Sequence, residues 1–178
     1  MKTQTNVILL RGVTPTGKNK VLMTPLRAAL EDAGLNKVRT YIQSGNVVVS
    51  TDLDQTAIEN LVHEVIRDSF GGNIAVFART ASYFESVLAR NPFTDADPAK
   101  LYCTLLAAKP ESAILEGFLA PGYLPDQVKV IDDMAYVLCA TKYNDLKINN
   151  NFIERKLRVS ATTRAHNTIA NLIDLAGR

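Results

Sequence analysis

A loop rich in cations near the start of the chain has residue types that bind phosphate. It follows an apolar run at residues 7–10 and reads Arg11-Gly12-Val13-Thr14-Pro15-Thr16-Gly17-Lys18-Asn19-Lys20. The loop holds three basic side chains, two glycines and no acid. Backbone N–H groups of such a loop can bind phosphate oxygens where it leads into a helix, and lysine adds charge. Arg11, Lys18, Asn19 and Lys20 are therefore candidate ligand-binding residues, although a basic loop that is merely solvated has the same composition.

Charge is unevenly distributed along the chain. Residues 1–50 hold seven basic and two acidic side chains, residues 51–141 hold six and thirteen, and residues 142–178 hold seven and three. In one interpretation the basic ends neutralise the acidic middle. In the other they meet as a cationic surface for a phosphate-bearing ligand. On the second interpretation, the C-terminal candidates for ligand binding are Lys147, Arg164, His166 and Asn167.

The common signatures of catalysis are missing from the sequence. It contains no GxxxxGK[ST] phosphate loop, no GxGxxG, no HExxH and no GxSxG. Its two histidines and two cysteines do not have zinc-binding spacing, so we expect no metal and no cofactor. His166 either caps the last helix or faces a ligand. Cys103 and Cys139 lie in apolar runs and are expected to be small, buried, reduced side chains in a reducing cytosol. A disulfide or redox pair is possible only if their two strands are adjacent.

Periodicity in the first half predicts the order strand, helix, strand, strand, helix, strand. The strands are expected at residues 7–10, 38–43, 46–50 and 74–78, and the helices at residues 24–33 and 54–70. Thr24 and Asp54 are the expected helix caps. The order is that of the ferredoxin-like βαββαβ unit, in which both helices cover one face of a four-stranded sheet. We expect the other face to be open, the first strand to lie beside the fourth, and the core to contain Val47, Val49, Ile58, Leu61 and Val65.

The two middle strands of this half are predicted to form a tight hairpin. The turn is the dipeptide Ser44-Gly45, which is typical of two-residue hairpin loops. This register pairs Tyr41 with Val48 and Ile42 with Val47. It places Arg39 and Tyr41 on the open face.

The second half echoes the first as βαββα. Strands are expected at residues 101–108, 127–131 and 134–140, and helices at residues 110–118, 145–157 and 167–176. The last helix takes the place of a final strand. The predicted fold class is α+β, with two ferredoxin-like halves that have antiparallel sheets. The halves are residues 1–79 and 100–178, joined by a helix and linker at residues 80–99.

Several motifs in a fixed order resemble one bacterial family. Residues 11–21 are similar to its RGINVGGKNKV opening, and residues 39–47 and 91–93 also match its motifs. Residues 150–157 and 161–168 resemble its NNFIERKL and ATTRNWNTV stretches. The family is known as domain of unknown function 1697, and the resemblance implies two ferredoxin-like halves and no established activity. The chain departs from the family at several points, among them Thr16 for a glycine, Asp145 for an arginine and His166 for a tryptophan.

Three kinds of function fit these observations. We favour binding of a phosphate-bearing ligand, either a nucleotide or a nucleic acid, at a basic surface formed by both chain ends. The RNA-recognition signature is missing and the pI is about 8.5, which is low for a nucleic-acid-binding domain. The alternatives are an enzyme that acts on a small anionic substrate between the halves, and an interaction module whose open sheet face binds another protein or the second half of the chain. No nucleophile and base can be paired from the sequence, so enzyme activity is left open.

The chain carries no sequence signal for a membrane. The apolar run at residues 7–10 is too short for a secretory signal, and no run is long enough to span a bilayer. We therefore expect a cytoplasmic protein with no membrane partner. Its oligomeric state is not indicated by the sequence.

Overall fold

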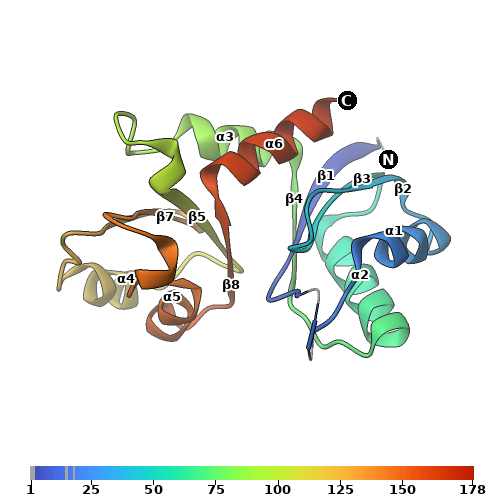
Figure 1. Ribbon diagram of the computed structural model, residues 1–178, viewed down its shortest axis with the longest axis horizontal. Coiled ribbons are helices and arrows are strands. Elements are labelled where there is room, and N and C mark those ends of the chain that lie inside the picture. The colour runs from blue at the N-terminus through green and yellow to red at the C-terminus, as the bar shows by residue number, and fades with distance from the viewer. Residues whose placement is uncertain (1–2, 15, 18) are drawn as a thin grey trace. The chain divides into compact units, whose positions relative to one another are not determined.

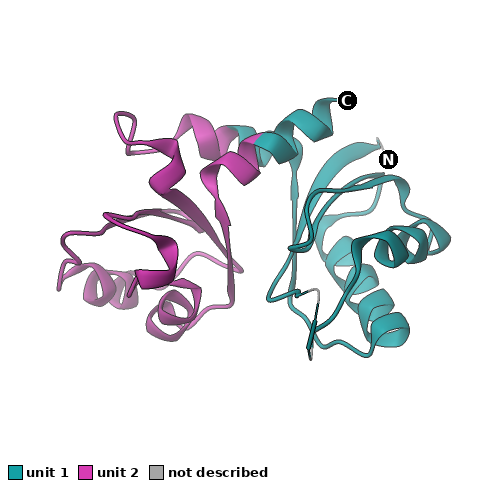
Figure 2. Cartoon of the chain, viewed as in Figure 1, with its two compact units in different colours: residues 1–85, 171–178 teal, residues 86–170 magenta. Residues whose placement is uncertain are grey.

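The chain divides into two compact units (Figure 2). Unit 1 consists of Met1–Glu85 with Asn171–Arg178, and unit 2 consists of Ser86–Ala170. The computed structural model describes residues 3–14, 16–17 and 19–178. Each unit has its own four-stranded antiparallel sheet with helices between the strands. The expected α+β fold in two halves is therefore confirmed.

Unit 1 has the predicted order of strands and helices (Figure 1). Its elements are β1 (Gln4–Leu10), α1 (Met23–Asp32), β2 (Asn36–Thr40), β3 (Asn46–Thr51), α2 (Gln55–Phe70), β4 (Val76–Thr80) and the start of α3 (Ala81–Ala89). The sheet order is β2-β3-β1-β4, so β1 is central and lies beside β4 as expected. Helix α2 begins at the predicted cap, where the Ala57 N–H donates to Asp54 Oδ1 at 2.8 Å. The predicted Thr24 cap is wrong, because α1 begins after Leu22 and no side chain caps it.

Both faces of the unit 1 sheet are buried. Helices α1 and α2 pack on the face that carries Ile8, Val47 and Val49, and the hydrophobic stripe of α2 places Ile58 in the same core. Leu61 and Val65 are partly buried against it. The side chains that alternate onto the other face are each at most 3% exposed, and they are Val7, Leu9, Val48 and Phe77. The expectation of an open face is therefore wrong.

The hairpin in unit 1 differs from its predicted register by two residues. Arg39 pairs with Val48 and Thr40 with Val47, so β2 ends at Thr40 and a longer connection precedes Asn46. The buried Asn46 side chain stabilises this connection by donating to the Tyr41 carbonyl at 3.1 Å and to Ser44 Oγ at 2.9 Å. Ile42 has a φ of 48° and is 54% exposed, so it leaves the strand rather than entering the core.

Unit 2 repeats this topology completely. Its elements are the remainder of α3, the 3-10 turn Pro98–Lys100, β5 (Leu101–Leu106), α4 (Ser112–Leu119), β6 (Gln127–Ile131), β7 (Met134–Leu138), the 3-10 turn Tyr143–Asp145, α5 (Asn150–Leu157), β8 (Ala161–Ala165) and the start of α6 (His166–Gly177). The sheet order is β6-β7-β5-β8. Strand β8 was not expected. Its sequence, ATTRA, has no large apolar residue, and Thr163 joins the sheet through a hydroxyl contact of 2.8 Å with Thr104.

The helix predicted over residues 145–157 is shorter than expected. It begins only at Asn150, because Asn149 is the cap and accepts a hydrogen bond from the Phe152 N–H at 3.1 Å. The residues before it form a 3-10 turn and then an irregular segment in which Leu146 and Ile148 are buried. Burial of these two side chains anchors the segment to the core that α5 covers.

The two units share more than their topology. The Leu10 N–H donates to the Gly45 carbonyl at 2.8 Å, and at the same position in unit 2 the Leu106 N–H donates to the Asp133 carbonyl at 2.8 Å. A second backbone hydrogen bond is also repeated. The Arg11 N–H donates to the Ala75 carbonyl at 3.0 Å in unit 1, and the Ala107 N–H donates to the Ser160 carbonyl at 2.8 Å in unit 2. Helices α2 and α5 each begin after an Asp or Asn cap and carry an Ile-Glu pair at their fourth and fifth positions. The chain is therefore a structural duplication of a βαββαβα unit.

A helix that crosses a lipid bilayer needs about 20 predominantly apolar residues. In the described part of the chain, no helix is both long and apolar enough to cross a membrane.

Candidate functional site

The β1–α1 loop, defined here as residues 11–22, has a folded structure of its own. Gly12 and Gly17 have φ values of 69° and 82°, which glycine adopts without strain. The Thr14 N–H donates to the Asn19 carbonyl at 3.2 Å, and the Val21 N–H donates to the Thr14 carbonyl at 3.4 Å. These two bonds close the neck of the loop and set its entry into α1.

The connection at residues 41–46 supports the β1–α1 loop. Besides the bond between Leu10 and Gly45, Gln43 Nε2 donates to the Val21 carbonyl at 3.4 Å. Gly45 has a φ of 76°, and a Cβ at this position would lie 2.7 Å from Leu10 Cβ and 3.2 Å from Val13 Cβ. Glycine is therefore required here by the backbone conformation and by the close approach. Two segments that are separate in the sequence form one structural unit.

The loop presents cations without nearby acids in the sequence. Lys20 is exposed and Arg11 is half-buried. Asn19 is half-buried and donates from Nδ2 to the Gly12 carbonyl at 3.4 Å, so it braces the loop. Lys18 lies outside the described residues. The first acid in the chain is Glu31, whose carboxylate pairs with Arg27 at 3.0 Å.

The C-terminal candidates have different environments within unit 2. Arg164 on β8 is only 9% exposed and donates to Thr162 Oγ1 and to the Thr163 carbonyl, both at 2.8 Å. Burial lowers the pKa of Arg164 to about 10, so the guanidinium stays charged at neutral pH. His166 begins α6 and is half-buried, and its Nδ1 has no hydrogen-bond partner among the described residues. Asn167 is exposed.

Lys147 lies in the irregular segment before α5. It is exposed and lines a pocket of about 390 Å³ together with Asp126 and Asp145. This pocket lies within unit 2, whereas the β1–α1 loop lies in unit 1. The convergence of the two groups of candidates on one surface stays a prediction.

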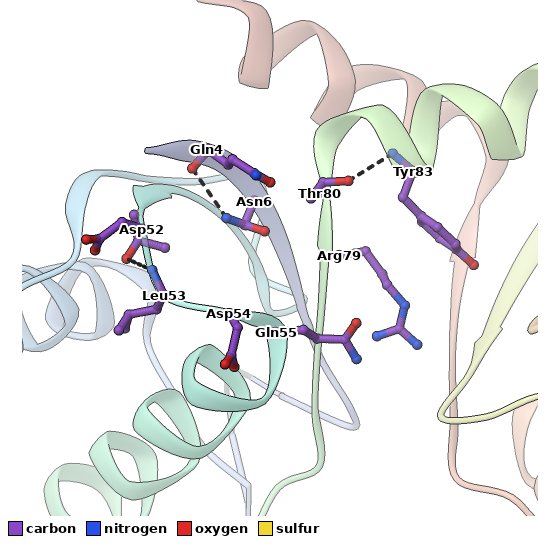
Figure 3. Close-up of a pocket in the computed structure, with 10 residues that line it drawn as sticks. Gln4, Asn6, Asp52, Leu53, Asp54, Gln55, Arg79, Thr80 and Tyr83 are labelled. Atoms are coloured by element: carbon purple, nitrogen blue, oxygen red, sulfur yellow. Dashed lines mark hydrogen bonds between the residues drawn. The ribbon is translucent and has the colours of Figure 1, made fainter. Parts of the chain in front are cut away.

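A second pocket, of about 620 Å³, lies in unit 1 at the end of β1 remote from the loop (Figure 3). We call it the Arg79 pocket. Its lining comes from β1, the turn between β3 and α2, the start of α2, the end of β4 and the start of α3, and comprises Gln4, Asn6, Thr51, Asp52, Leu53, Asp54, Gln55, Arg79, Thr80 and Tyr83. The sequence predicts Asp54 as a helix cap but does not predict the pocket, because the lining residues come from segments far apart in the sequence.

Glu59 organises one wall of the Arg79 pocket. Its Oε1 atom accepts hydrogen bonds from Gln55 Nε2 at 3.2 Å, the Ala78 N–H at 2.9 Å and Arg79 Nη1 at 3.3 Å. The Arg79 guanidinium also lies over the Tyr83 ring, 5.6 Å from its centroid. The side chain of Arg79 is 10% exposed. These contacts hold Gln55 and Arg79 in fixed positions at the wall.

The two cysteines and the metal-ligand residue types form no site within the described residues. Cys103 and Cys139 are free thiols. Cys103 pairs with Tyr136 across the sheet, and Cys139 lies three residues beyond Tyr136, so the two side chains are on opposite faces. In the described portion of the chain, no group of three His, Cys, Asp or Glu side chains could hold a metal ion.

Comparison with known proteins identifies a family. The family described as "Protein of unknown function (DUF1697)" matches residues 3–136. The chain belongs to this family. The matched range includes both the β1–α1 loop and the connection that supports it. It ends before residues 150–157 and 161–168, whose similarity to family motifs stays a prediction.

A solved structure has the same fold over nearly the whole chain. It is the structure of conserved bacterial protein SP0830 from Streptococcus pneumoniae, with a TM-score of 0.76 and 18% sequence identity. The alignment covers 98% of this chain and 99% of that chain. At this identity the likeness concerns the fold alone. No curated protein matches the chain.

Proposed function

We propose that this protein binds a small phosphate-bearing molecule, such as a nucleotide, on the β1–α1 loop. The observation that carries the proposal is the difference between the two units at this loop. Twelve residues connect β1 to α1, whereas only five connect β5 to α4 at the same position in unit 2. The extra residues are therefore not needed to complete the fold.

The chemistry of the extra residues favours an anion. The loop contributes the exposed Lys20 and the half-buried Arg11, and its glycines permit a close approach of the backbone to a ligand. The loop sequence contains no acidic residue. In the shorter connection of unit 2, the only lysine, Lys109, is paired with Asp132 at 3.4 Å.

A nucleotide fits the charge distribution better than a nucleic acid does. The formal net charge is only +2, and residues 51–141 carry an excess of acids. Domains that bind nucleic acid are usually strongly basic as a whole, whereas a small anion requires only a few local cations. We further propose that Lys18, which belongs to the same loop, adds to the positive charge of the site.

Isothermal titration with ATP and with inorganic phosphate tests the proposal. Lys20→Ala is expected to weaken ATP binding about tenfold, which corresponds to about 1.4 kcal/mol. Lys109→Ala is the matched control, because it removes a lysine from the equivalent connection and should leave the affinity unchanged. Equal effects of the two substitutions, or no ATP or phosphate binding by the wild type, would contradict the proposal.

A titration with duplex DNA distinguishes the nucleic-acid alternative. If DNA is the ligand, binding depends steeply on salt, and Lys20→Ala reduces the slope of log K against log salt by ~0.9 for each DNA phosphate that the lysine neutralises. A nucleotide site predicts instead that DNA does not compete with ATP.

A further inference from the structure

The Arg79 pocket is a second site whose chemistry differs from that of the loop. Gln4 and Leu10 are at opposite ends of β1, roughly 20 Å apart at ~3.4 Å per residue, so one small ligand does not occupy both places. The volume of about 620 Å³ lies within the range of ~300–1,000 Å³ that is usual for small-molecule sites. A ligand of the Arg79 pocket is therefore a different molecule from the ligand proposed for the loop.

Most residues that line the pocket have polar side chains, and some of these residues are buried. Asn6 and Thr51 are each 5% exposed, and the Arg79 side chain is 10% exposed. Figure 3 shows the Gln55 amide and the Arg79 guanidinium pointing toward one another, with Asp52 at the far end of the pocket. Asn6 Nδ2 donates to the Gln4 carbonyl at 3.3 Å, and Thr51 Oγ1 accepts from the Leu53 N–H at 3.2 Å. An amide and a hydroxyl can each form more than one hydrogen bond, so a ligand that fills the pocket can use the capacity that these contacts leave.

The charges of the pocket disfavour an anion. Asp52 and Asp54 outnumber the single cation of the lining, and the guanidinium of Arg79 is already paired with Glu59 at 3.3 Å. A cation is also disfavoured at this wall, because it would lie against Arg79. Asp54, for its part, is engaged as the cap of α2. A neutral polar molecule avoids both repulsions.

We infer that the Arg79 pocket binds a neutral, hydroxyl-rich molecule of the size of a monosaccharide. Side-chain amides have both a donor and an acceptor, as does each hydroxyl of a sugar. The amides of Gln4, Asn6 and Gln55 come from two elements and line the same pocket. Gln55 Nε2 donates to Glu59, so its carbonyl oxygen is oriented to accept from a ligand hydroxyl.

The positions of unit 2 that correspond to Gln55 and Asn6 have different contacts. Asn150, the first residue of α5, corresponds to Gln55, and its amide is engaged by β8: it donates to the Ala161 carbonyl at 3.1 Å and accepts from Thr163 Oγ1 at 2.9 Å. At the strand position of Asn6, unit 2 has Tyr102, whose ring centroid lies 4.4 Å from that of Tyr143. The amides in unit 1 are thus not a requirement of the topology.

Ligand-observed NMR by saturation transfer tests this inference on the full chain. The probes are D-ribose, D-glucose and myo-inositol at millimolar concentration, with putrescine and inorganic phosphate as charged comparisons. Gln55 is exposed, so Gln55→Leu keeps the fold while removing the amide and occupying part of the pocket. Thr56→Ala is the matched control, because the exposed Thr56 is its neighbour on α2 and does not line the pocket.

We expect at least one neutral probe to bind, about fivefold more weakly to Gln55→Leu and with unchanged affinity to Thr56→Ala. Absence of binding by all three neutral probes overturns the inference, as does binding that Gln55→Leu leaves unchanged. A putrescine or phosphate signal that Gln55→Leu abolishes overturns the neutral character of the site. Phosphate binding that responds to Lys20→Ala and not to Gln55→Leu belongs to the loop, so the two proposals fail or succeed separately.

Discussion

Burial determines the chemistry of the two cysteines in unit 2. Cys103 and Cys139 are each 2% exposed. Burial raises the pKa of Cys103 to about 12, and burial with the nearby charge of Asp126 raises the pKa of Cys139 to about 11. Both thiols therefore stay protonated at neutral pH, and a protonated, buried thiol is a poor nucleophile.

Thiol labelling checks this conclusion. At pH 8 the native protein is expected to react slowly with a thiol reagent at both cysteines, because neither thiolate nor access is available. In concentrated guanidinium chloride both should react at the rate of free cysteine. Rapid labelling of either residue in the native protein would show that it opens to solvent and would contradict a purely structural role.

The raised pKa values also predict a loss of stability at alkaline pH. Above pH 9 the unfolded chain releases thiol protons that the folded chain retains, so the free energy of unfolding falls as pH rises from about 9 toward 12. The slope approaches about 1.4 kcal/mol per pH unit for one fully titrating thiol. Guanidinium unfolding at pH 8 and pH 10 measures it. Between pH 8 and pH 10, the free energy of unfolding should fall less for Cys103→Ala than for the wild type. An equal fall would show that groups other than Cys103 cause the effect.

At the scale of the element, the connection at residues 41–46 and the β1–α1 loop depend on each other. Gly45 provides both the positive φ and the space that the end of β1 requires. The buried amide of Asn46 holds the connection in shape. Two stretches that are far apart in the sequence therefore act as one element. A substitution in the connection should alter the conformation of the proposed ligand loop.

Gly45→Ala tests this dependence. The left-handed φ of 76° and the clash with Leu10 together predict a loss of about 2–4 kcal/mol of unfolding free energy. Gly71→Ala is the control, since Gly71 has a φ of 66° with nothing within 4 Å of an added Cβ, and should lose only about 1–2 kcal/mol. Urea unfolding measures both. Equal losses would mean that the close approach to Leu10 is relieved at no cost.

For the whole molecule, the C-terminal segment belongs to the unit formed by the N-terminal strands. Asn171–Arg178 is part of unit 1, and Asn171 Nδ2 donates to the Tyr41 hydroxyl at 2.9 Å. Leu172 in this segment is fully buried. The first and last parts of the chain must therefore both be present before unit 1 is complete.

Leu172→Ala measures the contribution of this segment to stability. Loss of a fully buried leucine is expected to lower the free energy of unfolding by about 3 kcal/mol. Asp174→Ala, two residues away, should change it little, because the pair that Asp174 forms with Arg178 is exposed on both sides. Denaturant unfolding with a probe in unit 1 provides the measurement. Similar effects of the two substitutions would indicate that the C-terminal segment does not stabilise the unit.

Local patterns explain which elements could be predicted. Helix α2 is indicated by its cap and by hydrophobic side chains at helical spacing, and both signals are local to the helix. Strand β8 has no such signal, because its threonines become strand residues only by pairing with β5. The hairpin register was predicted wrongly because the Ser44-Gly45 dipeptide suggests a two-residue turn, whereas the amide of Asn46 stabilises a longer connection.

The sequence by itself determined the two α+β halves, the basic loop and the membership of a family whose motifs it carries, since composition, periodicity and local motifs are properties of neighbouring residues. The tertiary structure alone decided that Gly45 supports the loop, that Arg164 is buried, and that Glu59 on α2 binds Arg79 on β4 in a pocket. Each of these facts depends on contacts between residues distant along the chain. Such contacts leave no periodic trace in the sequence, because their spacing is set by the packing of sheets and helices.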